Sequence, residues 1–237
     1  MNPTPTILQR LLRTALRIAI LLFAGVPRLR NDDLPAGPVV LFAKHSSHFD
    51  VLVLWAAADA ALQKRLRPVG AADYWGRTPW LKWAAEWVLS AILIDRHPAP
   101  GERPLHDAEH ALKDGACLLI FPEGTRLTRH RVGPFKSGIY WLSKHNPDVA
   151  LVPTYVANAG RVLPKGDWLP TPTNCHVVTG APLRVEPDEL RPAFSTRAER
   201  AVGALMSPDV VEVDDDTGIA APASPTLAAL SSPRSPA

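Results

Sequence analysis

Short apolar segments alternate with amphipathic segments along the chain, and this alternation predicts the fold. The runs at 39–43 and 117–121 are continuous, apolar and rich in branched side chains, which is typical of buried strands. Further strands are predicted at residues 68–73, 91–94, 150–156 and 175–179. Helices are predicted at residues 46–62, 79–89, 104–113, 137–145 and 186–205, the last interrupted by Pro192. Strands that alternate with helices predict an α/β protein with a mostly parallel central sheet flanked by helices.

The N-terminal segment has a different pattern, because its first 30 residues hold five arginines and no acidic residue. Arg10, Arg13 and Arg17 have the spacing of one helical face, and leucines occupy much of the remaining wheel. The purely apolar stretch 18–26 has nine residues, too few to cross a bilayer. The pattern favours a basic amphipathic helix in a membrane interface. A helix that docks its leucines on the core and a signal peptide are the alternatives.

Composition narrows the class of protein. The chain has 237 residues, of which 46% are hydrophobic, so it is long enough for one domain with a real core. Its two cysteines, Cys117 and Cys175, cannot form a disulfide framework and favour a reducing compartment. The net charge of +3 hides an asymmetry, since residues 208–237 hold five acids and one arginine. The basic remainder favours a polyanionic partner, which leaves nucleic acid, anionic lipid and a phosphorylated substrate open.

A candidate general base follows the first predicted strand. On an ideal helix His45 and Asp50 would lie about 140° apart, so they meet only if His45 bends back over the helix start. Ser46 or Ser47 can cap that helix and provide the junction. A carboxylate that holds a histidine fixes its tautomer and stabilises the imidazolium. An incidental His–Asp pair is the alternative, and His48 competes for Asp50.

Cations gather at the ends of other predicted strands. In the segment 121–126, Gly124 permits close backbone approach to a ligand, and Arg126 offers a fork suited to phosphate. Glu123 is expected to orient Arg126 or to accept a hydrogen bond from a substrate hydroxyl. Arg96 lies at the end of the predicted strand 91–94, and Lys136 lies in the segment after the predicted strand 117–121. Their convergence predicts an anion pocket, with scattered surface charge as the alternative.

Two further motifs have competing interpretations. Trp80, Trp83 and Trp87 share a helical face near basic residues, which suits either a membrane interface or the core. The segment from His106 to His110 matches the H-x-x-E-H pattern of zinc peptidases, with Glu186 as the only distant third ligand that we nominate. A polar helix face explains the same two histidines without a metal, and no metal site is expected.

Four motifs, in their order along the chain, resemble those of the lysophospholipid (glycerophosphate) acyltransferase family, which contains bacterial 1-acyl-glycerol-3-phosphate acyltransferase. The matching motifs are His45-SSHF-Asp50, Leu93-Ile94-Asp95-Arg96, the complete Phe-Pro-Glu-Gly-Thr-Arg at 121–126, and Val152-Pro153. Two positions depart from the family pattern, since Ser90 replaces the usual Gly and Leu93 the usual Phe.

The resemblance implies a role for each matching residue. His45 would be the general base and Asp50 its orienting partner. Pro153 would shape the side of the site that takes the acyl donor. The expected substrate-binding residues are Arg96, Glu123, Gly124, Thr125, Arg126, Lys136 and Pro153.

The expected activity is transfer of a fatty acyl group from acyl-CoA or acyl carrier protein to a lysophospholipid, 1-acyl-glycerol-3-phosphate above all, without a cofactor. Glycerol 3-phosphate, another lysophospholipid and a non-glycerol lipid remain alternative acceptors. A zinc hydrolase, or a non-catalytic basic protein that binds membranes or nucleic acid, are alternative classes; nucleic acid is not an expected partner. We expect an interface segment at 1–34, an acyltransferase domain at 35–207 and a disordered tail at 208–237. The protein is expected on the cytoplasmic face of a membrane, peripheral or monotopic.

Overall fold

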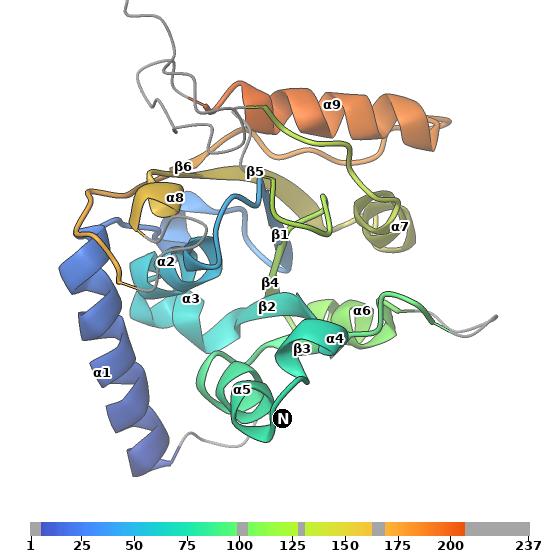
Figure 1. The fold of residues 1–237 in the computed structure, drawn as a ribbon. Coiled ribbons are helices and arrows are strands. Elements are labelled where there is room, and N and C mark those ends of the chain that lie inside the picture. Colours follow the sequence, from blue (N-terminus) through green and yellow to red (C-terminus); the bar gives the residue numbers. More distant parts are fainter. Residues whose placement is uncertain (1–5, 99–103, 128–130, 163–168, 207–237) are drawn as a thin grey trace, which may run out of the picture.

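The computed structural model describes residues 6–98, 104–127, 131–162 and 169–206 (Figure 1). The tail predicted at residues 208–237 lies outside these ranges. Strands and helices alternate along the described chain, and the predicted α/β class is confirmed.

A six-stranded sheet, in the order β3-β2-β4-β1-β5-β6, forms the centre of the molecule. Parallel pairing joins β1 to β4 and β5, and β2 to β3 and β4, whereas β6 runs antiparallel to β5. The mostly parallel sheet that the pattern predicted is therefore confirmed. Its strands are β1 (Val39–Ala43), β2 (Leu66–Ala71), β3 (Ile92–Ile94), β4 (Cys117–Ile120), β5 (Ala150–Ala157) and β6 (His176–Thr179).

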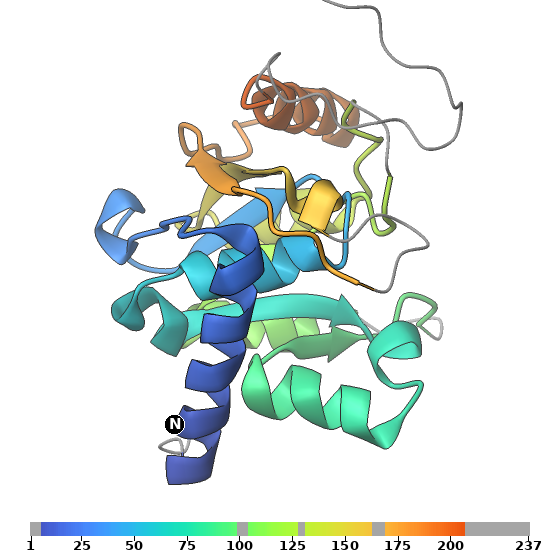
Figure 2. The same cartoon turned by 60° about the vertical axis from the view of Figure 1, so that its left-hand side comes forward.

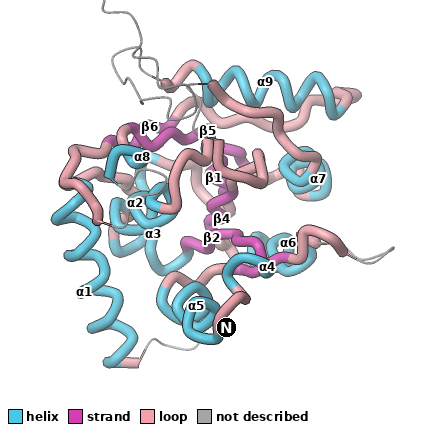
Figure 3. Tube along the Cα trace, in the orientation of Figure 1, coloured by secondary structure: helices cyan, strands magenta, loops and turns pink. Residues whose placement is uncertain are grey.

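Helices cover both faces of the sheet (Figure 3). One face packs against α1 (Ile7–Ala24), α2 (Phe49–Ala57), α3 (Ala60–Arg65) and α8 (Ala159–Val162). The other face packs against α6 (His106–Lys113), α7 (Gly138–His145) and α9 (Arg191–Gly203). Shorter segments are η1 (Asn31–Asp33), α4 (Ala72–Trp75), α5 (Pro79–Trp83) and the π-helical η2 (Ala84–Val88).

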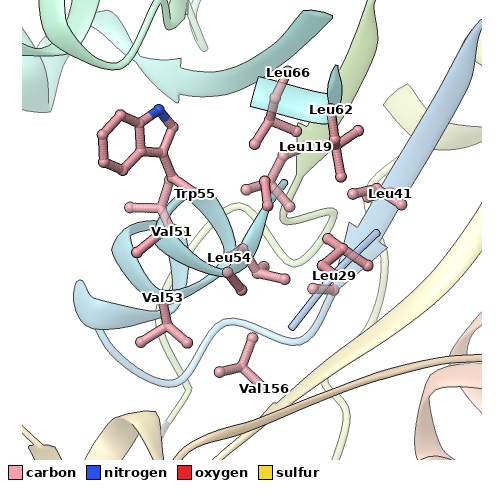
Figure 4. Packing of buried hydrophobic residues seen from close by; sticks show 14 of the residues in the cluster. Leu29, Leu41, Val51, Val53, Leu54, Trp55, Leu62, Leu66, Leu119 and Val156 are labelled. Carbon is pink, nitrogen blue, oxygen red and sulfur yellow. The ribbon is translucent and has the colours of Figure 1, made fainter. Parts of the chain in front are cut away.

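Burial on both faces explains why the central strands are continuously apolar. Every residue of β1 is buried, with Leu41 in one core and Val40 and Phe42 in the other. Figure 4 shows the first core, where Leu54 and Trp55 of α2 belong to one cluster with the strands. This packing fixes the strand ends that carry the polar residues of the site.

Three predicted helices differ in detail from the structure. The segment 46–62 forms two helices, because Asp59 accepts a hydrogen bond from the Leu62 amide at 2.8 Å and starts α3. The segment 79–89 divides into α5 and η2. Pro192 lies in the first turn of α9 rather than interrupting it, where the absence of an amide hydrogen costs no helical bond.

The N-terminal helix α1 is present and runs alongside the rest of the molecule (Figure 2). Of its predicted basic face, Arg13 and Arg17 turn toward the protein, whereas Arg10 is exposed. The Nε atoms of Arg13 and Arg17 donate to the backbone oxygens of Val88 (2.8 Å) and Ala56 (3.0 Å). The opposite face is apolar and exposed, with Leu11 63% exposed. The alternative in which the leucines dock on the core is therefore wrong for the exposed side chains Leu8, Leu11, Leu12 and Leu22. It is confirmed for Leu16 and Leu21, which pack against the core.

The tryptophans of α5 also face outward. Trp80 and Trp83 are 65% and 48% exposed, so the core alternative is wrong for these two side chains. Trp83 stacks on Trp87 with ring centroids 5.0 Å apart. Within the ranges that the structure describes, no helix combines the length and the apolar character needed to cross a bilayer.

Candidate active site

The parallel strands β1, β2, β3 and β4 bring their carboxyl ends to one edge of the sheet, where sites of α/β proteins usually lie. A cavity of about 590 Å³ opens at this edge. Its lining includes His45 after β1, Arg96 after β3, and Arg126 after β4. The imidazole and the guanidinium groups that the sequence singled out therefore share one cavity.

His45 and Asp50 meet as the sequence predicted. His45 Nδ1 lies 2.9 Å from Asp50 Oδ2, and the Asp50 side chain is 1% exposed. The same carboxylate accepts hydrogen bonds from the backbone amides of Ser46 (2.7 Å) and Ser47 (2.8 Å). Ser47 Oγ accepts from the amide of Phe49 at 3.1 Å, but His48 is the N-cap residue of α2 and no side chain caps the helix, so the expectation that Ser46 or Ser47 caps it is wrong. These contacts fold His45 back over the start of α2.

This arrangement defines which nitrogen of His45 can act as a base. A carboxylate only accepts hydrogen bonds, so the Asp50 contact places the proton on Nδ1 and leaves the lone pair on Nε2. The imidazole stacks on the ring of Phe121 with centroids 4.2 Å apart, and the His45 side chain is 18% exposed. The ring is thus fixed in orientation while it remains accessible from the cavity.

His48 does not compete for Asp50. Its Nε2 lies 2.9 Å from the hydroxyl of Tyr74, and the two rings stack with centroids 4.7 Å apart. Burial, with a further contribution from the charge of Arg126, lowers the pKa of His48 to about 4. His48 and Tyr74 form a separate polar pair on the cavity wall.

The predicted convergence of cations is confirmed at the turn that follows β4. Arg96, Arg126 and Lys136 all line the cavity, together with Thr125. Gly124 has a φ of +68°, which favours glycine, and a Cβ there would lie 2.7 Å from Cε of Lys136, so the lysine side chain would have to shift. The turn therefore presents several positive groups to an anion in the cavity.

Residues 27–157 match the sequence model of the acyltransferase family, which is more than half of the chain. The chain belongs to the acyltransferase family. The resemblance inferred from the four motifs is confirmed, since the matched segment contains all of them.

Related proteins agree with this assignment. The chain is 30% identical to 1-acyl-sn-glycerol-3-phosphate acyltransferase of Pseudomonas aeruginosa, over 74% of this chain and 66% of the relative. It is 28% identical to the chloroplastic 1-acyl-sn-glycerol-3-phosphate acyltransferase LPAT1 of Arabidopsis thaliana, over 60% of this chain and 37% of the relative. The matches thus span about two thirds and just over one third of the lengths of these relatives.

A solved structure supports the fold of this acyltransferase. The crystal structure of the 1-acyl-sn-glycerophosphate (LPA) acyltransferase PlsC from Thermotoga maritima superposes with a TM-score of 0.63 at 20% identity. The superposition covers 84% of this chain and 78% of the PlsC chain.

Glu123 of the acyltransferase motif has a role that the sequence did not predict. Its carboxylate is buried and accepts hydrogen bonds from the amides of His45 (2.9 Å) and Gly133 (2.7 Å). Burial raises the pKa of Glu123. The two carboxylate oxygens pair with these amides rather than with Arg126, so the expectation that Glu123 orients Arg126 is wrong, while its expected contact with a substrate hydroxyl stays a prediction. Glu123 instead positions the backbone of the candidate base.

Two more contacts attach His45 to the same loop. The His45 carbonyl accepts from the amide of Leu127 at 2.8 Å, and Nζ of the buried Lys44 donates to the Leu127 carbonyl at 3.0 Å. These contacts join the segment before α2 to the segment after β4.

Arg96 has a partner that sequence reasoning missed. Its guanidinium forms a two-point ion pair with Asp73, and its Nη1 donates to the Gly124 carbonyl at 2.9 Å. The hydrogen bond from Arg96 lowers the pKa of Asp73. Arg96 thus connects the ends of β2, β3 and β4. The position of Asp73 at the end of a predicted strand was the available signal.

Pro153 and the histidines of α6 do not belong to the cavity. Pro153 is buried in β5 opposite Phe42 and does not line this cavity, and its expected place beside the acyl donor stays a prediction.

The Nε2 atoms of His106 and His110 lie 3.1 Å apart. The nominated third ligand, Glu186, pairs instead with Arg197, with Oε1 3.8 Å from Nη2. Among the residues that the structure describes, no cluster of three metal-ligating side chains occurs. The described residues therefore provide no set of ligands for the zinc hydrolase alternative.

Proposed function

We propose that this acyltransferase transfers a fatty acyl group from a thioester, acyl-CoA or acyl carrier protein, to the free hydroxyl of 1-acyl-glycerol-3-phosphate. The product is phosphatidic acid. The observation that carries the proposal is one cavity lined by the Asp50-oriented His45 and by Arg96, Arg126 and Lys136. The names of two relatives, both 1-acyl-sn-glycerol-3-phosphate acyltransferases, support the choice of acceptor.

The geometry supports general-base catalysis by His45. Nε2 removes the proton of the acceptor hydroxyl as its oxygen attacks the acyl carbonyl carbon. The new ester bond forms, the carbon–sulfur bond breaks, and the thiolate leaves with the donor carrier and takes up the proton. A thioester is already an activated acyl donor, so the reaction needs no resident metal or cofactor.

The cations of the cavity are suited to the phosphate of the acceptor. Arg126 is exposed in the cavity lining, and Lys136 approaches the same turn across Gly124. Arg96 already donates to Asp73 and to the Gly124 carbonyl, so Arg126 and Lys136 are assigned as the main phosphate ligands. Arg96 contributes positive charge and holds the turn in place.

The exposed apolar residues give the enzyme a surface for lipid. We define the apolar surface as Leu8, Leu11 and Leu22 of α1 with Trp80 and Trp83 of α5, all of which are exposed. Apolar side chains of a helix together with tryptophan suit the interface of a bilayer, where the acceptor and the product reside. The proposed location is the cytoplasmic face of a membrane, with peripheral or monotopic attachment.

A panel of acceptors tests the activity. The purified protein is incubated with labelled acyl-CoA or acyl carrier protein and with lysophosphatidic acid, glycerol 3-phosphate or other lysophospholipids. Label is expected in phosphatidic acid, and turnover in His45→Ala is expected to fall by about 100-fold or more. His106→Ala, which changes an exposed histidine outside the cavity lining, is the matched control.

The same assay separates the alternatives. If another acceptor becomes labelled, that acceptor replaces lysophosphatidic acid as the proposed substrate, and the proposed acyl transfer is unchanged. Near-normal turnover of His45→Ala would refute the assignment of the base. Absence of labelled product with every donor and acceptor would refute the proposed activity.

A further inference from the structure

We infer that Arg13 of α1 is a positioning residue for the active site, because it holds the backbone turn that forms one wall of the cavity. The inference rests on the proposed function for its catalytic consequence. The outer face of α1 was assigned to lipid, and this inference gives its inner face a second role.

Polar side chains of α1 bind the end of η2. Arg13 Nε donates to the carbonyl of Val88 at 2.8 Å, and Arg13 Nη2 donates to Ser90 Oγ at 2.5 Å. One turn earlier, Gln9 Nε2 donates to the carbonyl of Trp87 at 2.5 Å. The last carbonyls of a helix lack partners within it, so α1 supplies donors where η2 ends.

The turn that Arg13 binds has an unfavourable backbone conformation. Ser90 has a φ of +56°, in the left-handed region where a residue with a Cβ is strained. Its hydroxyl is held by the Arg13 guanidinium, which is half-buried with it. The contact from α1 therefore stabilises a conformation that the serine backbone does not favour by itself.

The strained turn belongs to the cavity wall. Leu89 and Ala91, on either side of Ser90, both line the cavity. Their amides donate to the carbonyls of Ala84 (3.2 Å) and Ala85 (2.8 Å), and the chain then enters β3, which leads to Arg96. A change in the turn would move a wall of the site without touching His45.

Glycine at position 90 provides a rescue test, because glycine adopts this backbone conformation without strain. We expect Arg13→Ala to lower kcat/KM about tenfold on a soluble short-chain acceptor. Ser90→Gly alone is expected to change kcat/KM by less than about twofold, and Arg13→Ala with Ser90→Gly to recover most of the loss. A soluble acceptor removes membrane binding from the measurement.

Arg17→Ala is the matched control, since Arg17 anchors α1 to Ala56 rather than to the turn. Ser90→Gly is expected to give no recovery in the Arg17→Ala background. Hydrogen exchange provides a readout that is independent of activity. The amides of Leu89 and Ala91 are expected to exchange faster in Arg13→Ala and at the wild-type rate in Arg17→Ala.

Two results would overturn the inference: wild-type exchange at Leu89 and Ala91 in Arg13→Ala, or no recovery of kcat/KM with glycine at position 90. General misfolding of Arg13→Ala would accelerate exchange in β1 as well. In that case the variant Arg13→Ala with Ser90→Gly decides: slower exchange at Leu89 and Ala91 than in Arg13→Ala supports the inference, and equal exchange overturns it. If the wild-type protein acylates none of the acceptors, the proposed function fails, but the exchange experiment still tests the contact.

Discussion

The region around His45 and the apolar surface differ in how completely each side chain is fixed. Asp50 accepts from His45 and from two backbone amides, and Glu123 accepts from two more. On the apolar surface, by contrast, Leu11 and Trp80 are 63% and 65% exposed. Proton transfer requires fixed geometry, whereas insertion into lipid requires apolar area that the protein has not covered itself.

The two regions also differ in how they use charge. Around the cavity, Arg126 and Lys136 face the space where a substrate would bind. On α1, Arg13 and Arg17 turn inward and donate to backbone carbonyls of the protein. Membrane binding by this surface should therefore depend on apolar contact more than on attraction between arginines and anionic lipid.

Asp50→Asn should have the largest effect on the catalytic side of this comparison. His45 Nδ1 and both serine amides contact the same oxygen, Oδ2, so an asparagine oxygen could accept from all three, but the amide lacks the negative charge that stabilises the imidazolium formed in the reaction. Turnover is expected to fall by about 100-fold or more. Asp107→Asn, at an exposed carboxylate of α6, is the matched control, and turnover within about threefold of wild type in Asp50→Asn would contradict the assigned role.

Glu123→Ala should destabilise the same region. The change removes the acceptor of the His45 and Gly133 amides, and each amide left without a partner costs about 1–3 kcal/mol. Denaturant unfolding should therefore show a loss of about 2–6 kcal/mol, with lower turnover at low denaturant. Glu86→Ala, which removes only an exposed pair with Lys82, should change stability by less than about 0.5 kcal/mol.

Leu8→Ser with Leu11→Ser should weaken the apolar surface and spare the region around His45. Affinity for phospholipid vesicles is expected to fall about tenfold, while turnover on a soluble acceptor stays close to wild type. Leu190→Ser, at an equally exposed leucine before α9, is the matched control. Vesicle affinity that falls steeply with salt in the wild type would show that charge, rather than apolar area, dominates binding.

Sequence reasoning succeeded where the relevant residues are close along the chain. His45 and Asp50 are five residues apart at a strand–helix junction, so their contact follows from local geometry. The parallel sheet follows from continuous apolar runs, and it brings the strand ends together at one edge. The cluster of cations could therefore be predicted without knowledge of the side-chain contacts.

Sequence reasoning failed where packing between distant segments decides the outcome. Glu123 binds an amide 78 residues away, and Arg96 pairs with Asp73 on another strand end. Periodicity likewise showed that α1 has two faces but not which face turns inward. The inward turn of Arg13 depends on the free carbonyls at the end of η2, which no local pattern of α1 can indicate.

The smallest expected effect concerns the pH dependence of stability at His48, which lines the cavity. Folding lowers the pKa of His48 from an ordinary 6.5 to about 4, because burial and Arg126 disfavour the imidazolium. The unfolded chain therefore binds a proton that the folded protein excludes between these two values. Stability contributed by the neutral ring is full above about pH 6.5 and is lost as the pH falls toward about 4.

Urea unfolding at pH 7 and pH 4.5 measures this contribution. Because His48 is only partly buried, the wild type should lose about 1–2 kcal/mol more than His48→Gln between the two pH values. The exposed His106→Gln variant should lose as much as the wild type. An equal loss in wild type and His48→Gln would mean that the Tyr74 contact holds His48 equally well in both protonation states, since the phenol oxygen can also accept a hydrogen bond from the imidazolium.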